Sequence, residues 1–113
     1  MNLNEYQMAA KVSDRFTEVN NLMSPGMMEK VLGLTGEAGE VADKVKKVIR
    51  DDEGKISEEK KEQIAKELGD VLWYVASIAR YLGYSLEDVA KMNIEKLQSR
   101  MERGVLSGSG DDR

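Results

Sequence analysis

Apolar residues spaced three and four positions apart constrain this chain more than any other feature of its sequence. Between positions 27 and 50 they form a single row: Val31, Leu34, Ala38, Val41, Val45 and Val48. This spacing places all of them on one face of an α-helix. Pro25 is the single proline, and it follows a serine, which suits the start of a helix rather than its interior. The row therefore predicts a long helix with a narrow packing seam.

Similar signals predict three further helices, and no segment has the pattern of a strand. The expected helices span residues 4–20, 27–50, 58–82 and 86–103. Ser57 and Ser85 are suited to cap the last two of these. A chain of 113 residues can bury one modest core. We therefore expect one all-α domain over residues 1–113, of the four-helix-bundle type, with a glycine- and serine-rich flexible tail over 105–113.

The second half of the third expected helix points to self-association. Residues 71–82, VLWYVASIARYL, are apolar on almost every side. A helix of this kind is normally buried on all sides. Because a chain of this length has few other helices with which to surround it, we infer an oligomer in which another copy covers the remaining face.

The residue types that are missing restrict the chemistry. The chain has no cysteine and no histidine, which excludes disulfides, thiolate ligands and a histidine base. Any metal site must consist of oxygen ligands, which suit magnesium, manganese or calcium. A net charge of −4 argues against a nucleic-acid partner. No apolar run is long enough to span a membrane, and the first residues lack the pattern of a secretion signal, so we expect a cytoplasmic protein.

Two acidic pairs are the strongest chemical signal. Glu37 and Glu40 lie three residues apart in GEAGEV, and Glu67 and Asp70 lie three apart in KELGDV. The pairs fall on consecutive helices joined by a short loop, so an antiparallel arrangement can direct four carboxylates into one site. Such an oxygen cage suits Mg²⁺ that bridges to substrate phosphates. The alternative is that both pairs face water or pair with neighbouring lysines.

Glycines interrupt the helix that carries the first pair. Gly33, Gly36 and Gly39 lie three apart, and each destabilises a helix interior by roughly 1 kcal/mol relative to alanine. Their number suggests that a neighbouring helix or a ligand passes close to the backbone there.

The last expected helix carries a stripe of cations. Asn93, Lys96, Arg100 and Arg103 follow one another at spacings of three, four and three. Beside a metal site these side chains would neutralise the remaining charge of a polyphosphate. The alternative is a solvated face paired with glutamates of the same helix. The tail sequence GSGDDR could fold back as a phosphate-binding nest, or it could be a frayed end.

GEAGEV followed by KELGDVLWYVA resembles the paired acidic motif of the MazG-like nucleotide pyrophosphohydrolases, in the all-α NTP pyrophosphatase superfamily. In that motif, two glutamates, two spacers and a third glutamate precede a Glu-x-x-Asp pair. Glu37 and Glu40 match the second and third acids, and Glu67 and Asp70 match the closing pair. Gly36 stands at the first acidic position, which leaves the number of bound metal ions open. LNEYQ, NIEKLQSR and RGVLSGSGDDR also resemble small single-domain members, so the resemblance covers nearly the whole chain.

The resemblance implies a helical bundle that forms dimers or tetramers. It also implies Mg²⁺-dependent hydrolysis of a nucleoside triphosphate to the monophosphate and pyrophosphate. We expect the two acidic pairs to hold Mg²⁺ or Mn²⁺, and Glu37 or Glu40 to accept the proton as catalytic base. Asn93, Lys96 and Arg100 would orient the phosphates.

Two other interpretations stay open. One is a related enzyme of the superfamily that acts on dUTP, dUDP or phosphoribosyl-ATP, because no residue assigns the base or the sugar. The other is a non-catalytic helical protein that oligomerises or binds a partner and keeps only a vestigial site.

Overall fold

The computed structural model describes residues 1–16 and 22–112. These residues form four α-helices and no strand, in the order α1 (Leu3–Lys11), α2 (Pro25–Asp51), α3 (Glu58–Tyr81) and α4 (Leu86–Glu102). The all-α expectation is confirmed, and the last three helices agree with the expected ranges to within two residues. Within the described ranges, no helix combines the length and apolar character needed to cross a bilayer.

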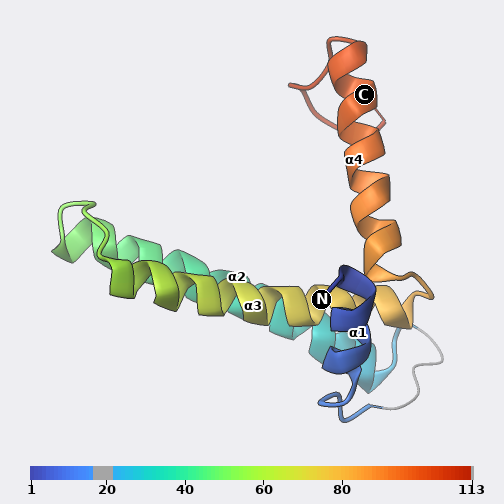
Figure 1. Ribbon diagram of the computed structural model, residues 1–113, viewed down its shortest axis with the longest axis horizontal. Helices are drawn as coiled ribbons and strands as arrows, with labels where there is room; N and C mark the ends of the chain where they lie inside the picture. The colour runs from blue at the N-terminus through green and yellow to red at the C-terminus, as the bar shows by residue number, and fades with distance from the viewer. Residues whose placement is uncertain (17–21, 113) are drawn as a thin grey trace.

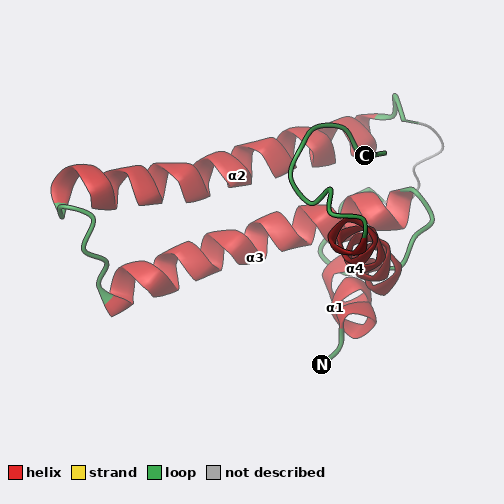
Figure 2. Ribbon diagram, turned by 90° about the horizontal axis from the view of Figure 1, so that it is seen from above, coloured by secondary structure: helices red, strands yellow, loops and turns green. Residues whose placement is uncertain are grey.

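The long helices α2 and α3 form an antiparallel hairpin, as their short connection predicts. They lie side by side over most of their length, while α1 and α4 gather at the end where α3 finishes (Figures 1 and 2). Helix α4 contacts α1 and α3 and extends away from the hairpin. The radius of gyration is 16.9 Å, whereas a compact domain of this length has about 13 Å. The described part of one chain is therefore an open arrangement of four helices rather than a closed bundle.

The helix starts and ends follow local side-chain chemistry. Ser24, Ser57 and Ser85 each accept a hydrogen bond from the backbone N–H three residues on, which satisfies one free donor of the first turn. Gly83 and Gly104 follow α3 and α4 with φ angles of 83° and 70°, a left-handed conformation that glycine adopts without strain.

The expected range of the first helix was wrong. Helix α1 ends at Lys11, and Asn2 caps its start. Ser13 donates its hydroxyl to the carbonyl three residues earlier, and Asp14 accepts a hydrogen bond from the amide two residues later. These local bonds compete with continuation of the helix. The expected helical segment over 17–20 lies outside the described residues.

Gln7 joins three helices at the open end of the hairpin. Its side chain is buried, and its amide nitrogen donates to the carbonyls of Ala76 and Tyr84, each at 3.1 Å. Its amide oxygen accepts from the Leu86 N–H at 3.0 Å, a donor in the first turn of α4. One buried amide thus fixes α1 against both α3 and the start of α4.

Within one chain, the apolar faces are only partly covered. Ala76 and Ala79 of α3 are buried, but Leu72 of the same helix and Leu82, which caps its end, stay exposed. The expectation that residues 71–82 are buried on all sides is therefore not met by the four helices alone. On α2, the predicted seam likewise contains both buried and exposed residues. Val48 is buried, whereas Val31, Ala38 and Val45 are exposed.

Candidate metal centre

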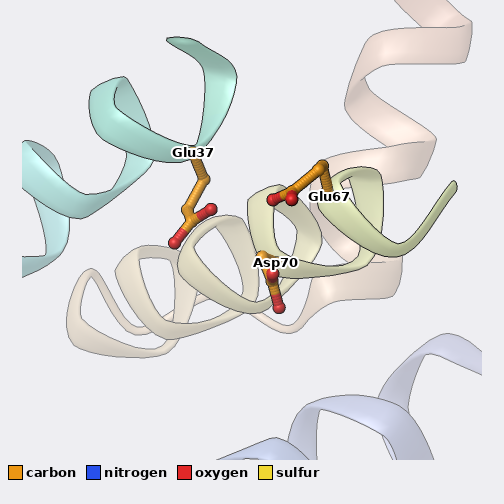
Figure 3. A group of neighbouring side chains, drawn as sticks. All are labelled: Glu37, Glu67 and Asp70. Atoms are coloured by element: carbon orange, nitrogen blue, oxygen red, sulfur yellow. The ribbon is translucent and has the colours of Figure 1, made fainter. Parts of the chain in front are cut away.

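Three acidic side chains meet between α2 and α3. Glu37 comes from α2 and extends toward Glu67 and Asp70, which share one face of α3 (Figure 3). One carboxylate oxygen of each residue lies within 4.8 Å of the others. Glu37 and Glu67 are partly buried, and Asp70 is exposed. The structure therefore brings together three of the four carboxylates expected to form the cage.

The charge of this acidic cluster is poorly compensated. The Lys44 ammonium lies 3.3 Å from Glu67, and it is the single cation within ion-pair distance of the cluster among the described residues. Three carboxylates against one ammonium leave an excess of two negative charges. Burial, the charges of Asp70 and Glu67 and a hydrogen bond shared with Glu67 raise the pKa of Glu37.

The donor set and its spacing fit a hard divalent cation. Mg²⁺ binds oxygens at about 2.0–2.1 Å in octahedral geometry, so two ligand oxygens on one ion are about 3–4 Å apart. Oxygens that already lie within 4.8 Å of one another reach that spacing through small rotations of their side chains. Two of the three ligands come from the same helix, which fixes their separation before any ion binds.

Glu40 lies outside the cluster. It is exposed, three residues after Glu37 on α2, and its charge adds to the rise in the pKa of Glu37. Lys44 stands four residues after Glu40, yet it pairs with Glu67 across the hairpin. Glu40 is therefore a nearby carboxylate with no ion pair among the described residues.

A cavity of about 340 Å³ opens beside the cluster. Two acids, two aromatic rings and a hydroxyl line it: Glu37, Asp70, Trp73, Tyr74 and Ser13. Tyr74 can lie against α2 because position 33 is a glycine. A Cβ atom at Gly33 would stand 2.2 Å from the tyrosine ring. The expectation of close approach is thus confirmed at this glycine, where the neighbour is a helix.

Gly36 and Gly39, the other two glycines of this series, have a different environment. No atom from elsewhere in the described ranges comes within 4 Å of a Cβ placed at Gly36 or Gly39. Close packing inside one chain therefore explains Gly33, but it does not explain Gly36 or Gly39.

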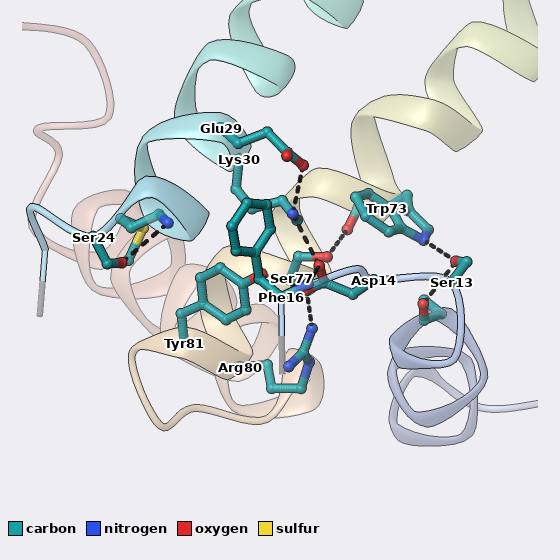
Figure 4. Close-up of polar contacts among 12 residues, drawn as sticks. Ser13, Asp14, Phe16, Ser24, Glu29, Lys30, Trp73, Ser77, Arg80 and Tyr81 are labelled. Carbon is teal, nitrogen blue, oxygen red and sulfur yellow. Dashed lines mark hydrogen bonds and ion pairs between the residues drawn. The ribbon is translucent and has the colours of Figure 1, made fainter. Parts of the chain in front are cut away.

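A buried ion cluster lies next to the cavity, and the sequence did not reveal it. Lys30 is fully buried, and its ammonium lies 3.0 Å from Asp14 and 2.7 Å from Glu29 (Figure 4). Asp14 also accepts hydrogen bonds from Tyr81 and, at 2.6 Å, from Arg80. Two signals could have indicated it: the helix-breaking Ser-Asp pair, and a lysine that shares the Glu37 face of α2 at seven residues' distance.

Aromatic rings enclose the buried ammonium. The rings of Phe16, Trp73 and Tyr81 lie 5.0, 5.4 and 5.7 Å from Lys30 Nζ, within the range of cation–π attraction. Trp73 also donates its indole N–H to the Ser13 hydroxyl at 2.9 Å. Trp73 and Ser13 line the cavity beside the acidic cluster. The buried ion cluster therefore helps to hold two of the residues that line this cavity.

Compensation of charge controls ionisation in the buried ion cluster. Burial alone would raise the pKa of Asp14, but hydrogen bonds from Tyr81, the Phe16 backbone, Lys30 and Arg80 outweigh it and lower the pKa to about 2. For Lys30, burial would lower the pKa, but its contacts with Glu29 and Asp14 raise it. Both groups are therefore charged at neutral pH.

The structure does not bring the cationic stripe to the acidic cluster. Asn93 and Lys96 line a separate cavity on α4, and Arg100 is buried beneath the C-terminal tail. Neither these residues nor any other part of α4 lines the cavity beside Glu37 and Asp70. Within one chain, the expected phosphate-orienting residues and the expected metal ligands are therefore apart.

Comparison with known proteins identifies the family. The model of the MazG nucleotide pyrophosphohydrolase domain matches residues 27–105. This chain belongs to that family. The matched region contains α3, α4 and all of α2 except its first two residues, and therefore both acidic pairs. Family membership implies nucleotide pyrophosphohydrolase chemistry on an all-α fold, and the acidic cluster gives this member oxygen ligands for a metal ion.

Two curated relatives are similar over most of their length. The Gene 37 protein of Mycobacterium phage L5 is 45% identical over 114 residues, which cover all of both chains. The uncharacterized protein YvdC of Bacillus subtilis (strain 168) is 38% identical over 99 residues, or 83% of this chain and 93% of YvdC. No solved structure matches the chain.

Proposed function

We propose that this chain is a cytoplasmic enzyme that hydrolyses a nucleoside triphosphate to the monophosphate and pyrophosphate, with Mg²⁺ or Mn²⁺ held by Glu37, Glu67 and Asp70. The observation that carries the proposal is the meeting of three poorly compensated carboxylates from two helices beside a cavity. Membership of the MazG family supports the reaction class.

The carboxylates have separate parts in this proposal. Bound Mg²⁺ supplies Lewis acidity toward the phosphates and the attacking water. With no histidine in the chain, a carboxylate takes the proton from that water as the anhydride between the α- and β-phosphates breaks. Glu40 and Glu37 are the candidates, and Glu40 has the advantage that it stands outside the acidic cluster.

We further propose that the active form is a homodimer or homotetramer. The exposed apolar side chains of the hairpin and the large radius of gyration favour a second copy packed against it. A second copy could also bring Asn93, Lys96 and Arg100 to the acidic cluster, where they would orient the phosphates. Sedimentation equilibrium tests the association, and a monomer at micromolar concentration would contradict it.

A substrate panel with and without Mg²⁺ tests the reaction. It includes the common ribo- and deoxyribonucleoside triphosphates, dUTP, dUDP and phosphoribosyl-ATP, with pyrophosphate and phosphate both detected. We expect pyrophosphate release that requires the divalent ion. Glu67→Gln and Asp70→Asn should each lower kcat by about 100-fold, which corresponds to about 2.7 kcal/mol of transition-state stabilisation.

Glu62→Gln is the matched control for that assay. Glu62 lies on the same helix, is exposed and pairs with Lys66 rather than with the acidic cluster. Its substitution should leave kcat unchanged. Full Mg²⁺-dependent turnover in both Glu67→Gln and Asp70→Asn, in folded protein, would refute the assigned metal ligands.

A further inference from the structure

Lys44 is a lysine of α2 that pairs across the hairpin. Its ammonium lies 3.3 Å from a carboxylate oxygen of Glu67 on α3, and both side chains are partly buried, with 30% and 19% of their surface exposed. Glu40 stands four residues before Lys44 on the same helix, at the spacing that favours an exposed pair. Lys44 nevertheless contacts the acidic cluster instead.

The other lysine pairs of the hairpin are local. Outside the buried ion cluster, each of those in the described part of α2 and α3 joins two residues three or four positions apart on one helix: Lys46 and Lys47 with Asp43, Lys61 with Glu58, and Lys66 with Glu62. Such pairs need only helical geometry. The pair of Lys44 with Glu67 instead requires the packing of α2 on α3, which also assembles the three carboxylates. Lys44 therefore belongs to the structure of the acidic cluster.

The charge of the cluster matches one divalent ion. Its three carboxylates contribute three negative charges and Lys44 contributes one positive charge, which leaves two negative charges. One Mg²⁺ or Mn²⁺ cancels them. Two such ions would give the group an excess of two positive charges, and like charges a few ångströms apart repel strongly in a partly buried site. Glu40 lies outside the cluster and is exposed, so water and salt screen its charge.

The position beside Glu37 supplies no further carboxylate for a second ion. Two-metal sites hold their ions about 3.5–4 Å apart, so the carboxylates must reach both ions. Gly36 precedes Glu37 on α2 and is exposed, and no atom from elsewhere in the described ranges lies within 4 Å of a Cβ placed there. There is space for a side chain at this position, but the sequence provides none. One oxygen of Glu67, meanwhile, is already engaged by the Lys44 ammonium.

We propose that Lys44 takes the place of a second metal ion in the acidic cluster, so that the nucleotide-free protein holds one divalent ion per chain. The ammonium cancels one carboxylate charge and leaves the other oxygen of Glu67 for the metal. Unlike a second ion, it is covalently attached to α2 and does not dissociate when the metal concentration falls. The nature of the ion rests on the proposed function, whereas the number of ions rests on the contacts of Lys44.

Electron paramagnetic resonance of Mn²⁺ counts the ions, because the sharp signal of the free ion is lost on binding. Titration of the nucleotide-free protein at physiological ionic strength, which screens weak binding to exposed acids, gives the number of sites and the Kd. We expect one ion per chain for the wild type. We expect two for Lys44→Glu, because this variant replaces the ammonium with a carboxylate.

Lys66→Glu is the matched control for the number of ions. It changes the charge by the same amount at the position next to Glu67 in the sequence, but Lys66 is exposed and pairs with Glu62. This variant should bind one ion, as the wild type does. Far-UV circular dichroism verifies that each variant keeps its helices.

Lys44→Gln removes the ammonium without adding a ligand, and it tests the affinity. Mn²⁺ should bind about two- to tenfold more tightly, because a nearby positive charge that repels the ion is lost. Lys66→Gln, which removes an exposed ammonium outside the cluster, should change the Kd by about twofold or less.

Three results would overturn the role of Lys44: two ions in the wild type, one ion in folded Lys44→Glu, or the same change of Kd in Lys44→Gln and Lys66→Gln. No nucleotide enters the titration, so these results leave the proposed reaction untouched. One ion per chain with the expected differences between variants, in a protein that hydrolyses no nucleotide, would keep the role of Lys44 and refute the proposed function. A wild type that binds no Mn²⁺ would remove the metal site and both proposals with it.

Discussion

Two groups of charged side chains lie along the α2–α3 hairpin and differ in how well their charges are compensated. In the acidic cluster, three carboxylates face one another and a single ammonium reaches them. In the buried ion cluster, Asp14 and Lys30 are almost completely buried, yet each has several partners of opposite charge or hydrogen-bonding groups. The more exposed group is thus the one whose charge is less well compensated.

The difference separates a site that needs a ligand from one that needs none. Like charges brought together raise the free energy of the folded chain unless a cation joins them. Compensated charges in a buried network instead fix the positions of the groups around them. Trp73 and Ser13 connect the two regions, because both line the cavity and Trp73 also packs on Lys30.

Breaking the buried pair should have the largest effect on stability. Lys30→Met removes a fully buried cation and leaves Arg80 as the one remaining cation beside Asp14 among the described residues, so we expect the free energy of unfolding to fall by about 3–5 kcal/mol. Urea unfolding at pH 7 measures it. Lys44→Met is the comparison, because that lysine pairs with Glu67 at a partly exposed position, and its loss should amount to about 1 kcal/mol or less. Equal losses in the two variants would remove the distinction between the clusters.

Adding a divalent cation should stabilise the folded protein, and it should do so through the acidic cluster alone. A ligand that binds the folded state alone adds about 2.7 kcal/mol at 100 times its Kd. Thermal unfolding in MgCl₂ against EDTA, at matched ionic strength, should therefore show a higher Tm with Mg²⁺. Glu67→Gln should lose this increase and Glu62→Gln should keep it. An equal increase in both variants would mean that Mg²⁺ binds elsewhere.

Lowering the pH should weaken the buried ion cluster. The pKa of Asp14 is about 2 in the folded chain, below its ordinary value of 3.8. The stability that this carboxylate contributes is therefore complete above about pH 4 and is lost as the pH falls toward 2, by about 2 kcal/mol in total. Urea unfolding between pH 5 and pH 2 gives the slope. The total loss of stability over this pH range should be smaller by about 2 kcal/mol in Asp14→Asn than in the wild type, and parallel curves for the two proteins would contradict the assignment.

The sequence predicted what depends on local chemistry. Three helices began at the expected serines, and the spacing of Glu67 and Asp70 placed them on one face of α3. Their meeting with Glu37 followed from the short connection between two long helices. Each of these features depends on residues close together in the chain.

What the sequence could not predict depends on contacts between distant residues. Asp14, which lies just beyond the end of α1, forms a buried ion pair with Arg80, and this partner is 66 positions away in the chain. Lys30 is buried because α3 supplies Trp73 and Tyr81 around it. The acidic motif gave Glu37 and Glu40 the same expected role as metal ligands, whereas only Glu37 of the two lies in the acidic cluster with Glu67 and Asp70.

The smallest expected effect is the most specific, because its sign should change with the metal. In EDTA, Asp70→Asn removes repulsion within the acidic cluster, so we expect it to stabilise the protein by a few tenths of a kcal/mol. At saturating Mg²⁺ the same substitution removes a ligand and should lower the Tm. Glu62→Gln breaks an exposed pair with Lys66 and should be slightly destabilising in both conditions. Differential scanning calorimetry resolves the four comparisons. If Asp70→Asn were destabilising without metal, Asp70 would already have a favourable partner in the free protein. The acidic cluster would then be compensated at Asp70, its most exposed member, and would no longer differ from the buried ion cluster in this respect.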